Sequence, residues 1–253
     1  MPNVLCLCGY TQNATIFRGR IAAIRKHSSA NTTFKFLDPP HIVPAVDLPE
    51  GSLTQYDSTA DSGGEENVPR AWWFAKELEG VKGGRSYGGL DESWRLLKDT
   101  LEKERFDILL GFSQGAAIAG FLASLLHMPH CDIKHPPFKL TILVAGFAMY
   151  DPQGFVFPLN GGKSPANTLH IIGRGDTVVS MDRAQSLIDK FQAPRIEIHE
   201  GGHFVPSKAN YRHFFKAVFD SVSDDPENAD GWRHVPAPSS SGRLSPTSTG
   251  GKL

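Results

Sequence analysis

Three residues of the sequence have side chains that together perform nucleophilic catalysis. Ser113 stands at the centre of a G-x-S-x-G pattern at residues 111–115, Asp176 follows a Gly-Arg-Gly run, and His203 follows two glycines. A serine hydroxyl is a weak nucleophile near neutral pH, so it needs a base to accept its proton, and a histidine oriented by a carboxylate supplies that base. The residue types therefore indicate acyl transfer by an activated serine.

The elements around Ser113 are those that a serine nucleophile requires. Residues 106–111 form an apolar run typical of a buried strand, and residues 116–126 are rich in Ala and Leu, as a helix is. A sharp turn between such a strand and helix exposes the serine hydroxyl, and flanking glycines let the two elements approach closely. The alternative is an ordinary turn with a serine N-cap, which the presence of a matching acid and histidine disfavours.

The other two candidates follow strands of the same expected sheet. Apolar or alternating runs predict further strands, and helical patterns separate them, so we expect a parallel sheet. The predicted fold is a doubly wound, mostly parallel α/β sheet of the α/β-hydrolase type, in a single domain. Because the carboxyl ends of parallel strands share one edge, Ser113, Asp176 and His203 are expected to meet there. Their order along the chain is also that of an α/β-hydrolase.

Rival residues exist for two of these positions. His199 could replace His203, but it lies inside a predicted strand, where a packed core imidazole is the simpler interpretation. Asp151 and Asp182 could supply the acid, whereas Asp176 is presented at a strand end by a glycine-rich turn.

The tetrahedral intermediate of acyl transfer needs donors for its negative oxygen. The backbone N–H of Gln114 is one donor by its position after the nucleophile. The second should come from the loop after the first strand, from the N–H of Tyr10, with that of Thr11 as the alternative.

An aromatic cluster stands in a long, irregular part of the chain. Trp72 and Trp73 could pin this segment onto the sheet or wall a substrate pocket, and the two interpretations are of equal weight. Together with Tyr10, Thr11 and Phe204 they are the candidate pocket residues, which would favour an apolar acyl chain over a charged substrate.

Composition narrows the class of protein. Of 253 residues, 26 are Lys or Arg and 27 are Asp or Glu, with no basic stripe, so a nucleic-acid partner is not expected. The N-terminus carries neither a signal-peptide pattern nor a membrane span, and we expect a cytoplasmic protein, with the nucleus left open. Cys6 and Cys8 are interpreted as buried free thiols rather than zinc ligands, and no metal or cofactor is expected.

The last part of the chain has a different composition. Residues 223–253 are rich in Asp, Pro, Ser and Gly and are predicted to form a disordered tail after a hydrolase domain at residues 1–222. Docking of Trp232 onto the domain is the less favoured alternative.

Several segments together resemble the FSH family of serine hydrolases, which are small α/β-hydrolases. They include residues 5–13, 36–41, 70–73, 111–116, 173–176 and 201–206. The resemblance implies hydrolysis of carboxylic esters or thioesters by Ser113, Asp176 and His203 without a cofactor. Cys8 departs from the family, which more often has a histidine before this glycine.

Two other functions stay open at this point. A hydrolase of the same fold could cleave amides or C–C bonds, and a hydrolase-like protein could bind a small ligand without turning it over. The sequence leaves the physiological substrate and the oligomeric state undetermined.

Overall fold

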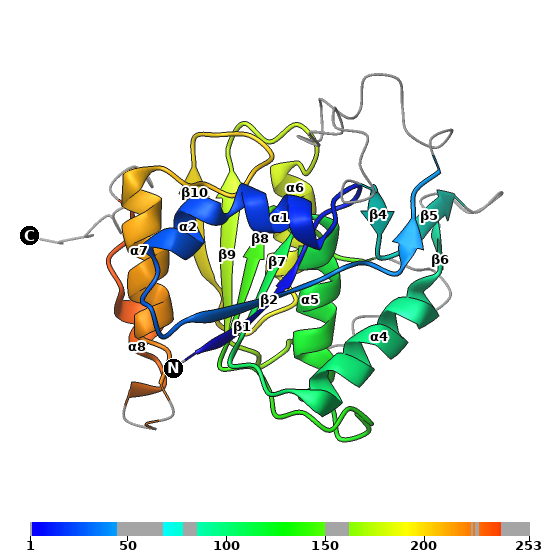
Figure 1. The fold of residues 1–253 in the computed structure, drawn as a ribbon, viewed down its shortest axis with the longest axis horizontal. Coiled ribbons are helices and arrows are strands. Elements are labelled where there is room, and N and C mark those ends of the chain that lie inside the picture. Colours follow the sequence, from blue (N-terminus) through cyan, green and yellow to red (C-terminus); the bar gives the residue numbers. More distant parts are fainter. Residues whose placement is uncertain are drawn as a thin grey trace, which may run out of the picture.

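A computed structural model describes residues 2–44, 68–77, 85–149, 162–223, 225 and 228–238. Its centre is a sheet of six strands, most of them apolar and buried (Figure 1). The strands are β1 (Asn3–Leu7), β2 (Thr33–Leu37), β7 (Ile108–Phe112), β8 (Leu140–Val144), β9 (Thr168–Gly173) and β10 (Arg195–His199).

Every neighbouring pair in this sheet is parallel, in the order β10-β9-β8-β7-β1-β2. From β1 the chain moves outward to β2 and later returns to β7 on the other side of β1. Loops that leave a parallel sheet at such a reversal diverge and open a crevice at the carboxyl ends of the strands. The loops after β1 and β7, which carry Tyr10 and Ser113, lie at this position. The expected fold class is confirmed.

Helices cover both faces of the sheet (Figure 1). On one face, apolar side chains of α1 (Ala14–Arg20), α2 (Ala22–His27) and α7 (Ala209–Asp220) share a core with the sheet, and this core contains Phe17, Ile24 and Phe215. On the other face lie α4 (Leu90–Lys103), α5 (Gln114–Leu125) and α6 (Met181–Ile188), which contribute Leu97, Ala116 and Leu187 to a second core.

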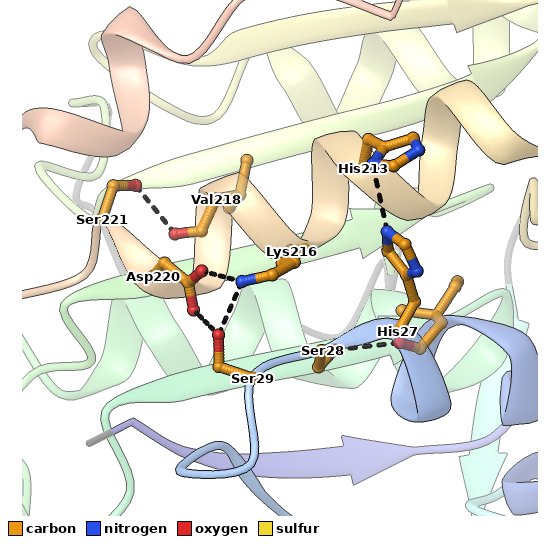
Figure 2. A network of polar contacts seen from close by, with 9 residues as sticks. His27, Ser28, Ser29, His213, Lys216, Val218, Asp220 and Ser221 are labelled. Atoms are coloured by element: carbon orange, nitrogen blue, oxygen red, sulfur yellow. Dashed lines mark hydrogen bonds and ion pairs between the residues drawn. The ribbon is translucent and has the colours of Figure 1, made fainter.

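Polar contacts join α2 and the turn after it to α7 (Figure 2). The Nε2 atom of His27 lies 3.0 Å from Nδ1 of His213. One helical turn along α7, Lys216 donates to the hydroxyl of Ser29 at 2.7 Å, and Ser29 donates to Asp220 at 2.6 Å. Because most of these groups are exposed, they orient the two helices but add little to stability.

Two short pairs of strands lie beside the main sheet. β3 (His41–Ile42) pairs with β4 (Arg70–Ala71), and β5 (Phe74–Glu77) pairs with β6 (Arg85–Gly88), both antiparallel. They flank Trp72 and Trp73 and fix this segment next to the carboxyl end of β1.

Part of the expected tail is ordered against the domain. The short helix α8 (Gly231–His234) buries the indole of Trp232 completely. Arg195 donates hydrogen bonds to the carbonyl oxygens of Trp232 and Val235, at 2.6 and 2.7 Å. The prediction of disorder from residue 223 onward is therefore wrong for residues 228–238, because one large ring and one distant arginine supply contacts that composition does not reveal. Residues 239–253 lie outside the described part of the chain.

Candidate active site

Ser113 occupies a strained turn between β7 and α5. Its backbone angles are φ 52° and ψ −115°, a conformation that residues other than glycine rarely adopt. The glycines on either side leave no room for a side chain. A Cβ added to Gly111 would lie 2.5 Å from the backbone oxygen of Gly115, and a Cβ added to Gly115 would lie 2.2 Å from that of Leu7. The turn thus brings strand and helix into direct backbone contact and pushes the serine side chain out of it.

The three candidate catalytic side chains meet at the carboxyl edge of the sheet. The Nε2 atom of His203 lies 3.0 Å from Oγ of Ser113, and its Nδ1 atom lies 2.8 Å from Oδ2 of Asp176. The His203 and Asp176 side chains are almost fully buried, so water competes little for their contact. With the Nδ1 proton donated to the carboxylate, Nε2 is left to accept the proton of the serine hydroxyl.

The second oxygen of Asp176 is also held. Its Oδ1 atom accepts hydrogen bonds from the backbone N–H groups of Val178 and Val179, both at 2.8 Å. Burial alone would raise the pKa of Asp176, but the hydrogen bonds from His203 and from these backbone groups lower it below the ordinary value. The group therefore stays a carboxylate at neutral pH and keeps the imidazole oriented.

The described rivals have other environments. His199 is buried, its Nδ1 accepts from the N–H of Gly201 at 3.1 Å, and burial lowers its pKa, as expected of a core imidazole. Asp182 is exposed in the first turn of α6, away from this hydrogen-bond chain. Asp151 lies outside the described residues.

The loop after β1 packs directly on the nucleophile. A Cβ added to Gly9 would lie 3.3 Å from Cβ of Ser113, which places Gly9, the residue before Tyr10, beside the serine. The N–H of Thr11, the alternative donor, already donates to the oxygen of Arg70 at 2.8 Å, and Thr11 has a positive φ of 65°. On the other side, Gln114 opens α5, where the first N–H groups have no partner inside the helix.

Trp72 and Trp73 lie inside the core, and they pin their segment onto the sheet. Trp72 is completely buried and Trp73 almost completely, and the indole N–H of Trp72 donates to the oxygen of Cys8 at 2.9 Å. The side chain of Gln114 accepts from the N–H of Trp72 at 2.9 Å and donates to the oxygen of Trp73 at 2.8 Å. We refer to these two hydrogen bonds as the Gln114 clamp. The sequence does not predict it, because no pattern shows where a glutamine side chain points.

A cavity of about 200 Å³ opens beside the imidazole of His203. Its apolar wall consists of Phe17, Phe112, Phe204 and Val205, and its polar groups are Gln12, Arg20, His203 and Ser207. Of the candidate pocket residues, Phe204 lines this cavity, whereas Tyr10, Thr11, Trp72 and Trp73 do not. Sequence reasoning missed Gln12, although it stands in the segment after β1 that already carried a candidate donor.

Cys6 and Cys8 are buried free thiols, as expected, and burial raises the pKa of both. Within the described ranges, no group of three or more His, Cys, Asp or Glu side chains is arranged to hold a metal ion. None of the helices described there is long and apolar enough to cross a membrane.

Comparison with known proteins agrees with the fold and identifies the family. A family model described as "Serine hydrolase (FSH1)" matches residues 1–215. Mouse esterase OVCA2 is 33% identical over 233 residues, which covers 87% of this chain and 96% of that protein. A Schizosaccharomyces pombe protein named dihydrofolate reductase is 33% identical over 213 residues, 83% of this chain but only 45% of that protein.

Solved structures share the fold at lower identity. Esterase PE8 superposes with a TM-score of 0.51 at 22% identity, covering 85% of this chain and 91% of that one. Maize acyl-protein thioesterase 2 gives a TM-score of 0.50 at 18% identity, covering 81% and 87%. Since the family model spans most of the sequence and relatives of matching length are esterases, this chain belongs to the FSH1 serine hydrolase family and is a hydrolase of the esterase type.

Proposed function

We propose that the protein hydrolyses carboxylic esters or thioesters through an acyl-enzyme intermediate on Ser113. The observation that supports this most directly is the unbroken chain of hydrogen bonds from Ser113 through His203 to Asp176. Each bond lies within the range that proton transfer requires.

The proposed reaction has two halves. In the first, Oγ of Ser113 attacks the carbonyl carbon while Nε2 of His203 takes the hydroxyl proton, and the carbonyl oxygen becomes negative. The intermediate then collapses, the bond to the leaving alcohol or thiol breaks, and His203 returns the proton to the leaving atom. In the second half, water attacks the acyl-enzyme with His203 again as base, and the acid leaves.

Two backbone donors are proposed to stabilise the negative oxygen. The N–H of Gln114 stands at the start of α5, where the helix dipole adds a favourable field, and the N–H of Tyr10 approaches from the loop after β1. Loss of one such donor typically costs about 3 to 4 kcal/mol of transition-state stabilisation.

The substrate class follows from the surroundings of the site. Aromatic side chains form much of the described cavity, and no cluster of basic side chains faces it. Such a lining accommodates an uncharged organic group, and the names esterase and acyl-protein thioesterase among similar proteins fit the same class.

Labelling with a fluorophosphonate tests the proposal. The probe forms a covalent bond only with an activated serine, so wild-type protein should react and Ser113→Ala should not. Ser186→Ala, which removes an exposed hydroxyl from α6, is the matched control and should label like wild type. Mass spectrometry should place the adduct on Ser113. Equal labelling of wild type and Ser113→Ala would exclude Ser113 as the nucleophile, and no labelling of either would favour a ligand-binding protein.

A further inference from the structure

The described cavity lies on one particular side of the catalytic chain of hydrogen bonds. Of the three residues in that chain, only His203 lines it, together with the neighbouring Phe204 and Val205. In acyl transfer from an ester to a serine, the imidazole gives its proton to the departing oxygen or sulfur, so the leaving group lies against the imidazole. If Ser113 acts as proposed above, this cavity is therefore where the alcohol or thiol part of the substrate sits.

A hydrogen bond fixes the orientation of one polar side chain in the cavity, that of Gln12. Oε1 of Gln12 accepts a hydrogen bond from the backbone N–H of Gly9 at 3.2 Å. Because a backbone N–H can only donate, the amide atom that meets it must be the oxygen, and the NH2 group occupies the other end. The backbone of Gln12 is also fixed, since its N–H donates to the oxygen of Gly9 at 3.2 Å.

The NH2 group of Gln12 makes no hydrogen bond within the described part of the chain, and it is not among the side-chain atoms that are sealed from solvent there, although the residue as a whole is only 3% exposed. Because Gln12 lines the cavity, a molecule or water held there can accept a hydrogen bond from this group. A donor that is held rigidly, unmatched and next to the catalytic imidazole is suited to receive an acceptor atom from a bound molecule.

We propose that Gln12 determines specificity for the leaving group, by donating from Nε2 to an oxygen close to the bond that is cleaved. The aromatic rings of Phe17, Phe112 and Phe204 contact the carbon atoms of the same group. The enzyme then prefers leaving groups with an ether, carbonyl or hydroxyl oxygen near the ester linkage over alkyl groups of the same size. Arg20 lines the same cavity, and its positive charge favours such oxygen atoms over cationic groups.

Two esters of the same acid test this assignment. The n-butyl and 2-methoxyethyl esters have leaving groups of equal length. The methoxyethyl group has an ether oxygen at the position where the butyl group has a methylene. The ratio of their kcat/KM values is measured for wild type and two variants. Gln12→Glu retains an acceptor for the N–H of Gly9 but lacks the NH2 group, and Gln12→Met lacks both and is uncharged.

Both variants should lower the preference for the methoxyethyl ester by about three- to tenfold, the usual effect of one hydrogen bond. The intrinsic reactivity of the two esters cancels, because only the change in the ratio between proteins is compared. Gln185→Glu, on the exposed side of α6, is the matched control and should keep the wild-type ratio.

Two results would overturn the proposal. In one, the ratio stays at the wild-type value in both Gln12 variants. In the other, the Gln12 variants leave the ratio for the two leaving groups unchanged and instead alter the kcat/KM ratio of ethyl methoxyacetate to ethyl butanoate, in which the extra oxygen lies in the acyl part. A wild-type protein that cleaves no ester and takes no fluorophosphonate on Ser113 would instead remove the reaction itself, so the two failures are distinguishable.

Discussion

The carbonyl oxygen of Gly202 lies so close to Gly173 that a Cβ added there would come within 2.5 Å of it. These glycines belong to the two turns that carry Asp176 and His203. The turns are also joined by hydrogen bonds, since the N–H of Gly175 donates to the oxygen of Gly201 at 3.0 Å. The spacing between the carboxylate and the imidazole therefore depends on direct backbone contact between the loops after β9 and β10.

Gly173→Ala should separate these turns and lower kcat. The methyl group has no space against a carbonyl oxygen, and a displacement of about 1 Å in a catalytic group can cost roughly 100-fold in rate. Ester hydrolysis under saturating substrate measures the effect. Gly19→Ala in α1 is the control, because a Cβ there meets nothing within 4 Å, and its activity should equal that of wild type. Full activity of Gly173→Ala would show that the close contact does not position the site.

Asp176→Asn should reduce kcat by about four orders of magnitude, because an amide no longer fixes the histidine tautomer or stabilises its charged form. Asp182→Asn changes the exposed rival carboxylate and should leave kcat unaltered. A large loss of kcat in Asp182→Asn together with an unaltered kcat in Asp176→Asn would show that the acid is assigned to the wrong residue.

The same carboxylate links stability to pH. The pKa of Asp176 is lowered in the folded protein, so its contribution to stability is complete above the ordinary aspartate pKa of about 3.9 and is lost as the pH falls through the folded value. Asp176→Asn should therefore lose more unfolding free energy at pH 7 than at pH 3. Urea denaturation at both pH values measures the difference, and an equal loss at both would contradict the hydrogen-bonded carboxylate.

How far the sequence predicts this site depends on whether a residue's position follows from the backbone alone. Ser113, Asp176 and His203 each lie in the turn that follows a strand, and parallel strands bring their carboxyl ends to one edge, so their meeting could be predicted. The cavity could not, because Phe17 lines it through the packing of α1 against Phe112, whose ring lies 6.2 Å from that of Phe17, and Gln12 is oriented there by the N–H of Gly9. Side-chain direction within a helix or loop is not contained in hydrophobic periodicity.

The side chain of Gln114 should matter for stability independently of its backbone N–H. Gln114→Ala leaves the buried N–H of Trp72 and the oxygen of Trp73 without their partners, which costs about 1 to 3 kcal/mol for a buried group. Chemical denaturation gives the change in unfolding free energy. Gln185→Ala removes an exposed glutamine from α6 and should change it by less than about 0.5 kcal/mol. A loss no greater than in that control would mean that the Gln114 clamp is unimportant.

Buried histidines should make the fold sensitive to mild acid. Burial lowers the pKa of His170 to about 3, whereas an unfolded chain binds this proton near pH 6.5. Between these values the unfolded state holds the extra proton, so His170 makes unfolding easier by about 1.4 kcal/mol for each pH unit of acidification. The slope measured by urea titration from pH 6 to pH 4.5 should decrease in His170→Leu and persist in His130→Gln, which changes an exposed histidine. His135 and His199, whose pKa values burial also lowers, leave part of the slope in place. An unchanged slope in His170→Leu would contradict a neutral, buried imidazole.

The docked segment at residues 228–238 should stabilise the domain without taking part in catalysis. Trp232 is completely buried, and replacing such a residue by alanine typically costs about 3 to 5 kcal/mol. Arg195, which donates to the backbone of this segment, stands at the start of β10, at the opposite end of the strand from the turn that carries His203. Trp232→Ala should therefore lower the melting temperature while kcat at 25 °C stays at the wild-type value.

A double-mutant cycle with Arg195→Met separates docking from a general loss of core. If the arginine acts by holding the segment, removing both groups costs less than the sum of the single losses, because either change alone already releases α8. Ile196→Ala, a neighbouring exposed position on β10, should add independently to Trp232→Ala. Additive losses for Arg195 and Trp232 would mean that the ring and the guanidinium stabilise the domain separately. In that case the salt bridge from Arg195 to the buried Glu197, at 2.6 Å, would account for the effect of the arginine.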